Sequence, residues 1–220
     1  MKLYIGNKNY STWSLRAWLI LEKHALQFEE ITLSLDTDAF YKRLENLSPT
    51  KKVPTLIDDE NTVWESLAIC EYINDRYLSG AAWPQCLEYK AKARAMACEM
   101  LAGFMAVRNE LPMNIRAHRK VVLSEQAIKE IKRIEAIWSE QYLQFKQQGG
   151  WLFGQWSIAD AMFAPVVLRF KTYGIEVNEA ATGYINHTLD CPSLQKWIME
   201  SALETDIVEH DEAGIEVIKS

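Results

Sequence analysis

Four residues in the stretch 51–77 have types and spacing suited to binding a small peptide. Val53 and Pro54 stand at the start of an expected strand, where proline cannot donate to a ladder. Such a bend leaves the backbone N–H and C=O of Val53 free to bond an extended peptide. Glu65 and Ser66 stand at a helix start, where Ser66 either caps its own helix or holds a ligand carboxylate. Glu65 beside it attracts an ammonium, so the group fits a small zwitterionic peptide. An ordinary hairpin followed by a capped helix is the structural alternative.

These residues lie in a predicted β-α-β-α-β-β-α order. Alternating apolar residues predict strands, and helical periodicity predicts helices. The strands are expected at 2–5, 31–35, 53–57 and 62–64, and the helices at 13–25, 39–46 and from residue 66 onward. A helix between strands favours parallel pairing of the first two, and the short turn at 58–61 requires an antiparallel hairpin. This order is the thioredoxin-like one.

A segment rich in Gly and Pro at 79–85 separates this α/β part from a second part with helical periodicity throughout. An apolar stripe over 93–111 predicts one long helix that Pro112 kinks or ends. A second stripe over 131–145 predicts a partner helix, and the two are expected to pack as a hairpin. We therefore expect a thioredoxin-like domain at 1–79, a linker at 80–87 and an all-α domain at 88–220.

Ser157 and Asp160 form a variant capping box at the start of a further apolar helix, and its role is structural. A short helix is expected at 194–203. The acidic segment 204–216 is expected to be a solvated end of the chain.

Composition excludes several classes of protein. The 220 residues are 49% hydrophobic, which suffices for a sizeable core. The net charge of −6 without a basic cluster disfavours nucleic-acid binding. No apolar segment predicts a signal peptide or a membrane span, so we expect a protein of the cytoplasm. The four cysteines and four histidines show no metal-ligand spacing, and no metal site or disulfide framework is expected.

Taken as a set, the residues of the 51–77 stretch resemble the glutathione site of the glutathione transferase superfamily. The matching segments are Val53-Pro54-Thr55-Leu56, Glu65-Ser66 and the helix from Ala68 to Ile73. The S-I-A-D box at 157–160 is a further mark of that superfamily. The resemblance implies glutathione as co-substrate, an all-helical second domain, a homodimer and a role in detoxification. It also implies that Lys52, near the glycyl carboxylate, joins Val53, Pro54, Glu65 and Ser66 in binding glutathione.

Conjugation requires that the thiol of glutathione, with a free pKa of about 8.5, be a thiolate near neutral pH. A helix start with one hydroxyl donor supplies that stabilisation, which directs attention to residues 9–16. No cysteine lies in this loop, which disfavours disulfide-reductase and thiol-transferase chemistry. Among the hydroxyls we favour Ser11, with Thr12 and Tyr10 behind it. Similarity to the S-S-C-S-W-R-V-R segment of zeta-type members places the sulfur-contacting serine at Asn9, which stays a second candidate.

The second substrate is expected to be electrophilic, partly apolar and bound between the domains. The residues expected around it are Trp13, Phe104, Met105, Arg108 and Met113. Resemblance to the zeta class implies that Arg108 and Arg116 attract a carboxylate-bearing substrate. The favoured function is a glutathione transferase. The alternatives are a glutathione-dependent cis-trans isomerase of the maleylacetoacetate type and a non-catalytic glutathione-binding or scaffold protein of the same fold.

Overall fold

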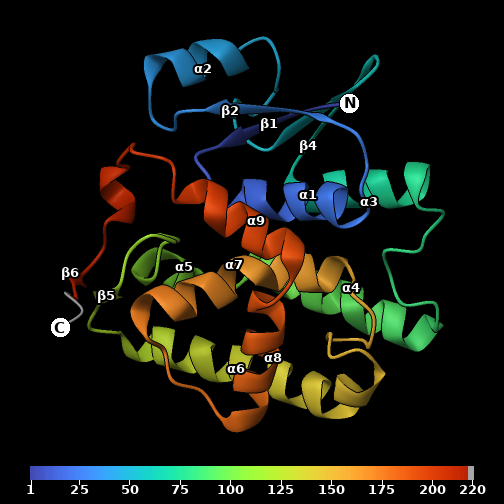
Figure 1. The fold of residues 1–220 in the computed structure, drawn as a ribbon, viewed down its shortest axis with the longest axis vertical. Helices are drawn as coiled ribbons and strands as arrows, with labels where there is room; N and C mark the ends of the chain where they lie inside the picture. Colours follow the sequence, from blue (N-terminus) through green and yellow to red (C-terminus); the bar gives the residue numbers. More distant parts are fainter. Residues whose placement is uncertain (218–220) are drawn as a thin grey trace.

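The computed structural model describes residues 1–217 and begins with an α/β part built on one four-stranded sheet (Figure 1). Its strand order is β2-β1-β3-β4. The strands are β1 (Lys2–Gly6), β2 (Glu29–Leu33), β3 (Thr55–Asp58) and β4 (Asn61–Trp64). β1 pairs parallel with β2 and antiparallel with β3, and β3 forms an antiparallel hairpin with β4. The predicted pairing directions and the thioredoxin-like arrangement are confirmed.

Three helices cover this sheet. They are α1 (Thr12–Lys23), α2 (Asp38–Leu44) and α3 (Ser66–Tyr77). Figure 1 shows α2 on one side of the sheet and α1 with α3 on the other, facing the rest of the chain. α1 is buried on nearly every side because it packs against α3 and also against α7 of the second part. The start of α1 therefore lies where the two parts of the chain meet.

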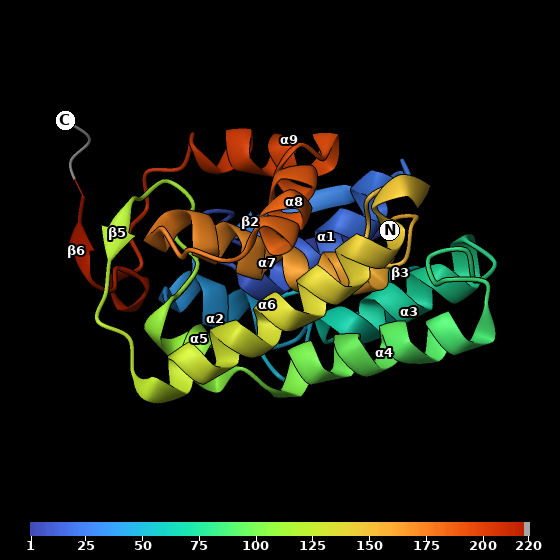
Figure 2. The same ribbon diagram turned by 90° about the horizontal axis from the view of Figure 1, so that it is seen from below.

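The second part is mostly helical. Its helices are α4 (Leu87–Ala102), α5 (Met105–Glu110), α6 (Glu125–Phe145), α7 (Ile158–Tyr173), α8 (Glu179–Leu189) and α9 (Pro192–Ser201). Two 3-10 turns (Lys146–Gln148 and Glu209–Asp211) and a short strand pair, β5 (Arg119–Lys120) with β6 (Ile215–Glu216), complete it. α4 and α6 run beside each other in Figure 2, linked by the Arg133–Glu99 and Lys92–Glu140 ion pairs. None of the helices within residues 1–217 is long and apolar enough to cross a bilayer.

The single long helix expected over 93–111 is wrong, because the chain breaks between α4 and α5. Gly103 is extended and Phe104 adopts a left-handed backbone conformation with φ of 57°. Glycine is a poor helix former, and the break leaves free carbonyls at the end of α4. The Arg108 guanidinium satisfies them: Nε donates to Gly103 O at 2.9 Å and Nη2 to Leu101 O at 3.3 Å. A side chain five residues further along thus stabilises the break.

The start of α7 has the capping box formed by Ser157 and Asp160. The Asp160 carboxylate is buried and accepts four hydrogen bonds. They come from Ser157 N (2.9 Å), Ser157 Oγ (3.0 Å), Leu152 N (3.0 Å) and Tyr184 Oη (3.2 Å). Burial raises the pKa of Asp160 to about 6, although each of these bonds acts in the opposite direction. The box therefore ties α7 to both the preceding loop and α8.

Two histidines pack against tryptophans near the end of α1: His24 is the residue that ends α1, and His187 lies in α8. His24 packs edge-on against Trp156, with ring centroids 5.6 Å apart, and His187 packs against Trp151 at 4.5 Å. Burial lowers the pKa of both imidazoles, and Lys23 adds to the shift. The unfolded chain binds these protons near pH 6.5, whereas the folded chain binds them only at lower pH. The stability from these residues is therefore complete above about pH 6.5 and is lost as the pH falls through the folded values.

We expect the melting temperature to fall less between pH 7.5 and 5.5 in a His24→Gln/His187→Gln double variant than in the original protein. The comparison between proteins is needed because Asp160 and Asp211, with pKa values raised to about 6, titrate in the same range. Calorimetric melts at several pH values provide the measurement. Equal pH dependence in both proteins contradicts the assignment to the two imidazoles.

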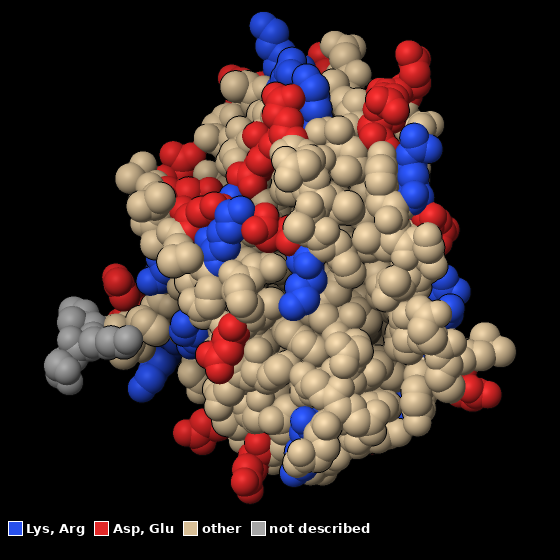
Figure 3. All heavy atoms as spheres, turned by 45° about the vertical axis from the view of Figure 1, so that its right-hand side comes forward, with Lys and Arg blue, Asp and Glu red and all other residues tan. Residues whose placement is uncertain are grey.

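Charged residues are mixed on the face shown in Figure 3. Lys and Arg side chains are interspersed with Asp and Glu there, and no continuous basic patch forms on that face. This face offers no track for a phosphate backbone.

Candidate functional site

A cleft of about 620 Å³ lies between the α/β part and the helical part. Six segments line it: the start of α1, residues 35–41 around the start of α2, residues 50–53, α5, Arg169 of α7 and the 3-10 turn at 209–211. A smaller adjoining hollow of about 130 Å³ is lined by Trp13, Thr50, Lys52, Val53, Pro54 and Glu65. The structure thus brings both groups of candidate residues, from the 51–77 stretch and from the loop before α1, to one place.

One wall of the hollow has the free peptide edge that the sequence predicts. The Val53–Pro54 bond is cis, and within residues 1–217 neither backbone group of Val53 has a hydrogen-bond partner. Glu65 follows with a φ of 66°, and α3 begins directly after it. Ser66 Oγ is fully buried and has no hydrogen-bond partner among the described residues. An unpaired backbone edge beside a helix start suits a peptide with a free carboxylate.

Ser11, the favoured hydroxyl, lies at the edge of the cleft but is already engaged. Its Oγ donates to Ser14 Oγ at 2.7 Å, and Ser14 Oγ accepts from Gly6 N at 3.1 Å. Ser11 also makes no side-chain cap bond to α1. The Ser11 proton therefore points into the protein, toward the first strand, and away from the cleft.

Thr12, the next residue, lines the same cleft with a different hydrogen-bond pattern. Its Oγ1 accepts from Arg169 Nη2 at 2.7 Å. A guanidinium only donates, so the threonine proton remains available for another acceptor. Thr12 is also the first residue of α1, and its own N–H donates to Tyr10 O at 2.9 Å. This hydroxyl fits an anion in the cleft better than that of Ser11.

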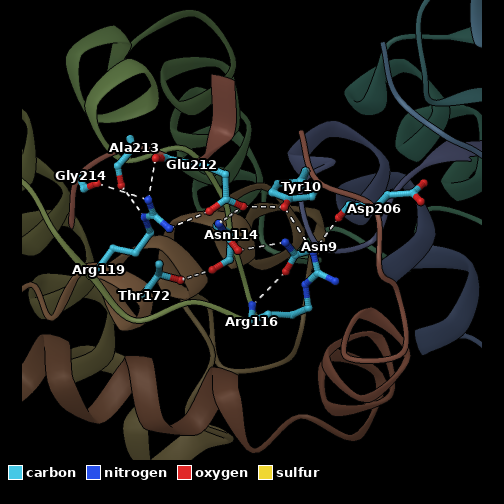
Figure 4. A network of polar contacts seen from close by, with 10 residues as sticks. All are labelled: Asn9, Tyr10, Asn114, Arg116, Arg119, Thr172, Asp206, Glu212, Ala213 and Gly214. Carbon is cyan, nitrogen blue, oxygen red and sulfur yellow. Dashed lines mark hydrogen bonds and ion pairs between the residues drawn. The ribbon is translucent and has the colours of Figure 1, made fainter. Parts of the chain in front are cut away.

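Asn9, the candidate from the family register, is fully buried and does not line the cleft. Its Nδ2 donates to Asn114 Oδ1 at 2.9 Å, and its Oδ1 accepts from Arg116 N at 2.9 Å. Figure 4 shows this side chain between those two residues. The Asn9 side chain is therefore bonded inside the protein and away from the cleft, and a sulfur donor at this position stays a prediction. Its amide instead joins the loop before α1 to the helical part.

The acidic segment 204–216 is not the solvated end expected from the sequence. Glu204 accepts from the backbone N–H groups of Lys8 (2.6 Å) and Asn9 (2.9 Å). Glu212 accepts from Tyr10 Oη at 2.6 Å and pairs with Arg119 at 2.6 Å (Figure 4). Burial, followed by the bond to Glu212, raises the pKa of the Tyr10 phenol. No local periodicity in the sequence predicts these contacts of the acidic segment, because each partner lies far away along the chain.

The comparisons with known proteins agree with this geometry. Residues 10–76 match a family model described as "Glutathione S-transferase, N-terminal domain". A solved glutathione transferase homolog from Burkholderia, with bound glutathione, is 25% identical, covers 91% of this chain and 97% of its own, and superposes with a TM-score of 0.70. These two comparisons support a place for the chain in the glutathione transferase superfamily.

Two further relatives within the superfamily are named as isomerases. A probable maleylacetoacetate isomerase from Caenorhabditis elegans is 24% identical over 194 residues, which cover 87% of this chain and 89% of the relative. A solved bacterial maleyl pyruvate isomerase of the zeta class shares the fold, with a TM-score of 0.71, 18% identity and coverage of 94% and 100%.

Only some of the residues predicted to surround the second substrate line the cleft. Trp13, Met105 and Arg108 line the cleft. Phe104 and Met113 do not, because both side chains are buried in the core. The left-handed turn at Phe104 directs its ring inward between helices.

The two arginines expected to attract a carboxylate are bonded within the protein. Arg108 is held by carbonyls at the end of α4. Arg116 donates to Asp206 O at 2.8 Å and to Tyr10 Oη at 3.2 Å. Within residues 1–217 no cluster of three or more His, Cys, Asp or Glu side chains is placed to hold a metal ion.

Proposed function

We propose that this protein is an enzyme that binds glutathione in the cleft and adds its thiolate to a small, partly apolar electrophile. The observation that supports it best is the unpaired backbone of Val53, which faces a cleft that also contains the start of α1. A scaffold protein has no use for an unsatisfied peptide edge in such a place. The match to the family model and the glutathione bound to the Burkholderia relative support the same conclusion.

Each part of glutathione has a partner of matching chemistry in this proposal. The peptide backbone bonds to Val53 as an added strand does. The glutamyl carboxylate binds at the start of α3 through Ser66, and its ammonium binds Glu65. Lys52 lies nearest the glycyl carboxylate. The cysteinyl sulfur then reaches the start of α1, beside Thr12.

The second substrate decides between conjugation and isomerisation. In conjugation, the new bond between the glutathione sulfur and a carbon of the electrophile persists in the product. In isomerisation the thiolate adds to a cis double bond, the adduct rotates, and the thiolate leaves again, so that glutathione is regenerated. The resemblance to the Caenorhabditis elegans protein favours isomerisation of a cis-enone as the second candidate. The division into domains at 1–79 and 88–220, a homodimer and a cytoplasmic location belong to the same proposal.

Calorimetric titration with glutathione tests binding directly. We expect binding at millimolar glutathione or below, and a dissociation constant about tenfold higher in Ser66→Ala, because a charge-assisted bond is lost. Ser79→Ala, an exposed position beyond the other end of α3, is the matched control and is expected to bind as the original protein does. Absence of binding by the original protein contradicts the proposal.

A further inference from the structure

Three arginines lie around the start of α1, two of them against the ring of Trp13. The guanidinium of Arg16 lies 4.4 Å from the centroid of the Trp13 ring, and that of Arg108 lies 4.7 Å from it. Arg169 lines the same cleft and bonds to Thr12. None of the three forms an ion pair with a carboxylate in the described part of the chain. The cluster therefore concentrates positive charge that no direct ion pair among the described residues neutralises.

Arg16 is the most deeply buried member of the cluster. Its side chain is 0% exposed, and its Nε donates to Met162 O at 3.1 Å. Both of its terminal nitrogens are buried without a hydrogen-bond partner among residues 1–217. Burial, followed by the charges of Arg108 and Arg169, lowers the pKa of this guanidinium. Cations arranged in this way are stabilised by an anion bound nearby.

The other carboxylates near the cluster do not fill that role. Glu130 acts on the pKa of Arg108, and Asp211 acts on the pKa of Arg169. In both cases the carboxylate acts through its charge and forms no ion pair with the arginine. The first turn of α1 contains no acidic residue. The positive end of the helix dipole thus adds to the field of the arginines.

Arg169 is held rigidly by the end of α5. Its Nη1 donates to Arg108 O at 2.9 Å and to Leu111 O at 2.7 Å. Its Nη2 is thereby directed at Thr12 Oγ1, 2.7 Å away. Because the guanidinium occupies a lone pair of this hydroxyl and cannot accept, the Thr12 proton must turn elsewhere. The cleft is the open side.

We infer that Arg169 is a positioning residue that turns the Thr12 hydroxyl toward the cleft, where this hydroxyl donates to the thiolate of bound glutathione. The inference rests on the proposed function and adds a residue from α7 to the sulfur site. On binding, the thiol loses its proton to solvent, and Thr12 keeps its own proton while sharing it with the sulfur. No bond to carbon forms in this step. The positive charges of the arginine cluster stabilise the thiolate, and the Thr12 hydroxyl donates a directed hydrogen bond to its sulfur.

Ultraviolet titration of the thiolate in the enzyme–glutathione complex tests the inference. We expect Thr12→Val and Arg169→Met each to raise the pH midpoint of thiolate formation by about one to two units, since a hydrogen bond to the charged form is lost. Thr12→Ser is expected to restore the original midpoint. The double variant is expected to shift by less than the sum of the two single shifts, because part of the effect of Arg169 acts through the Thr12 hydroxyl. Arg133→Met, on the exposed side of α6, is the matched control and is expected to leave the midpoint unchanged.

A second ligand separates positioning from structural damage. S-methylglutathione has no ionisable thiol, so its dissociation constant is expected to stay within about twofold in every variant that folds. If Arg169→Met does not fold, Arg169→Lys takes its place, because one ammonium cannot span the α5 carbonyls and Thr12 together. An unchanged midpoint in the folded Arg169 variant, or additive shifts in the double variant, overturns the inference. Failure of the original protein to bind either ligand overturns the proposed function instead.

Discussion

Replacing Asp160 with alanine is expected to lower the free energy of unfolding by about 3 to 5 kcal/mol, because it leaves four buried donors without an acceptor. An unpaired buried donor costs about 1–3 kcal/mol, and removal of the charged acceptor also relieves a burial cost. The net loss is smaller than the sum for that reason. Urea denaturation followed by circular dichroism measures the change.

Two companion variants define what is lost. Ser157→Ala removes only one side of the capping box and is expected to cost about 1 kcal/mol. Asp160→Asn retains one acceptor oxygen and is expected to fall between the two alanine variants. Turnover per folded molecule should be the same in all three, since the box does not touch the cleft. A urea midpoint for Asp160→Ala equal to that of the original protein would refute the structural role.

Replacing Thr12 with valine is expected to lower kcat/KM for the glutathione reaction about a hundredfold at neutral pH. Loss of one preorganised donor to a developing or full anion costs about 2.7–4 kcal/mol, and a factor of one hundred corresponds to the lower end of that range. Valine matches threonine in shape, so the bond lost is the hydroxyl alone. Steady-state rates with saturating glutathione and a panel of aryl halides, organic peroxides and a maleyl-type cis-enone supply the measurement.

Ser11→Ala and Asn9→Ala are the controls for this second prediction. Ser11 donates into the protein, so its removal is expected to change kcat/KM by less than about threefold. Asn9→Ala is expected to lower the melting temperature, because it leaves Asn114 Oδ1 without its donor and the Arg116 N–H without its acceptor. A rate loss in Ser11→Ala as large as in Thr12→Val would restore Ser11 as the sulfur donor.

The parts of the site that the sequence could predict are those built from neighbouring residues. Val53-Pro54 and Glu65-Ser66 lie within one hairpin and helix, so proline chemistry and the helix start suffice to place them. The parallel and antiparallel pairings follow from the lengths of the connections. The helix break at Gly103 was not predictable from an unbroken apolar stripe, because the side chain of Arg108 stabilises it from outside the stripe.

The choice among hydroxyls shows the limit of local patterns. Ser11 and Thr12 are adjacent and chemically alike, and a helix start accepts either. They differ because Arg169, 157 residues away, takes a lone pair of Thr12, whereas Ser14 takes the proton of Ser11. Only the packing of α7 against α1 distinguishes them. The same holds for the acidic segment, whose partners lie near residues 8–10 and 114–119, far away along the sequence.

The contact between Glu204 and the Lys8 N–H, 196 residues apart, has a consequence for how the protein folds. Closing so long a loop carries a large entropic cost, so such a contact forms after the local hairpins and helices. During synthesis the sheet can form while the loop that leads into α1 still lacks its last partners. The start of α1, which lines the cleft, is therefore assembled late, after Glu204 has left the ribosome.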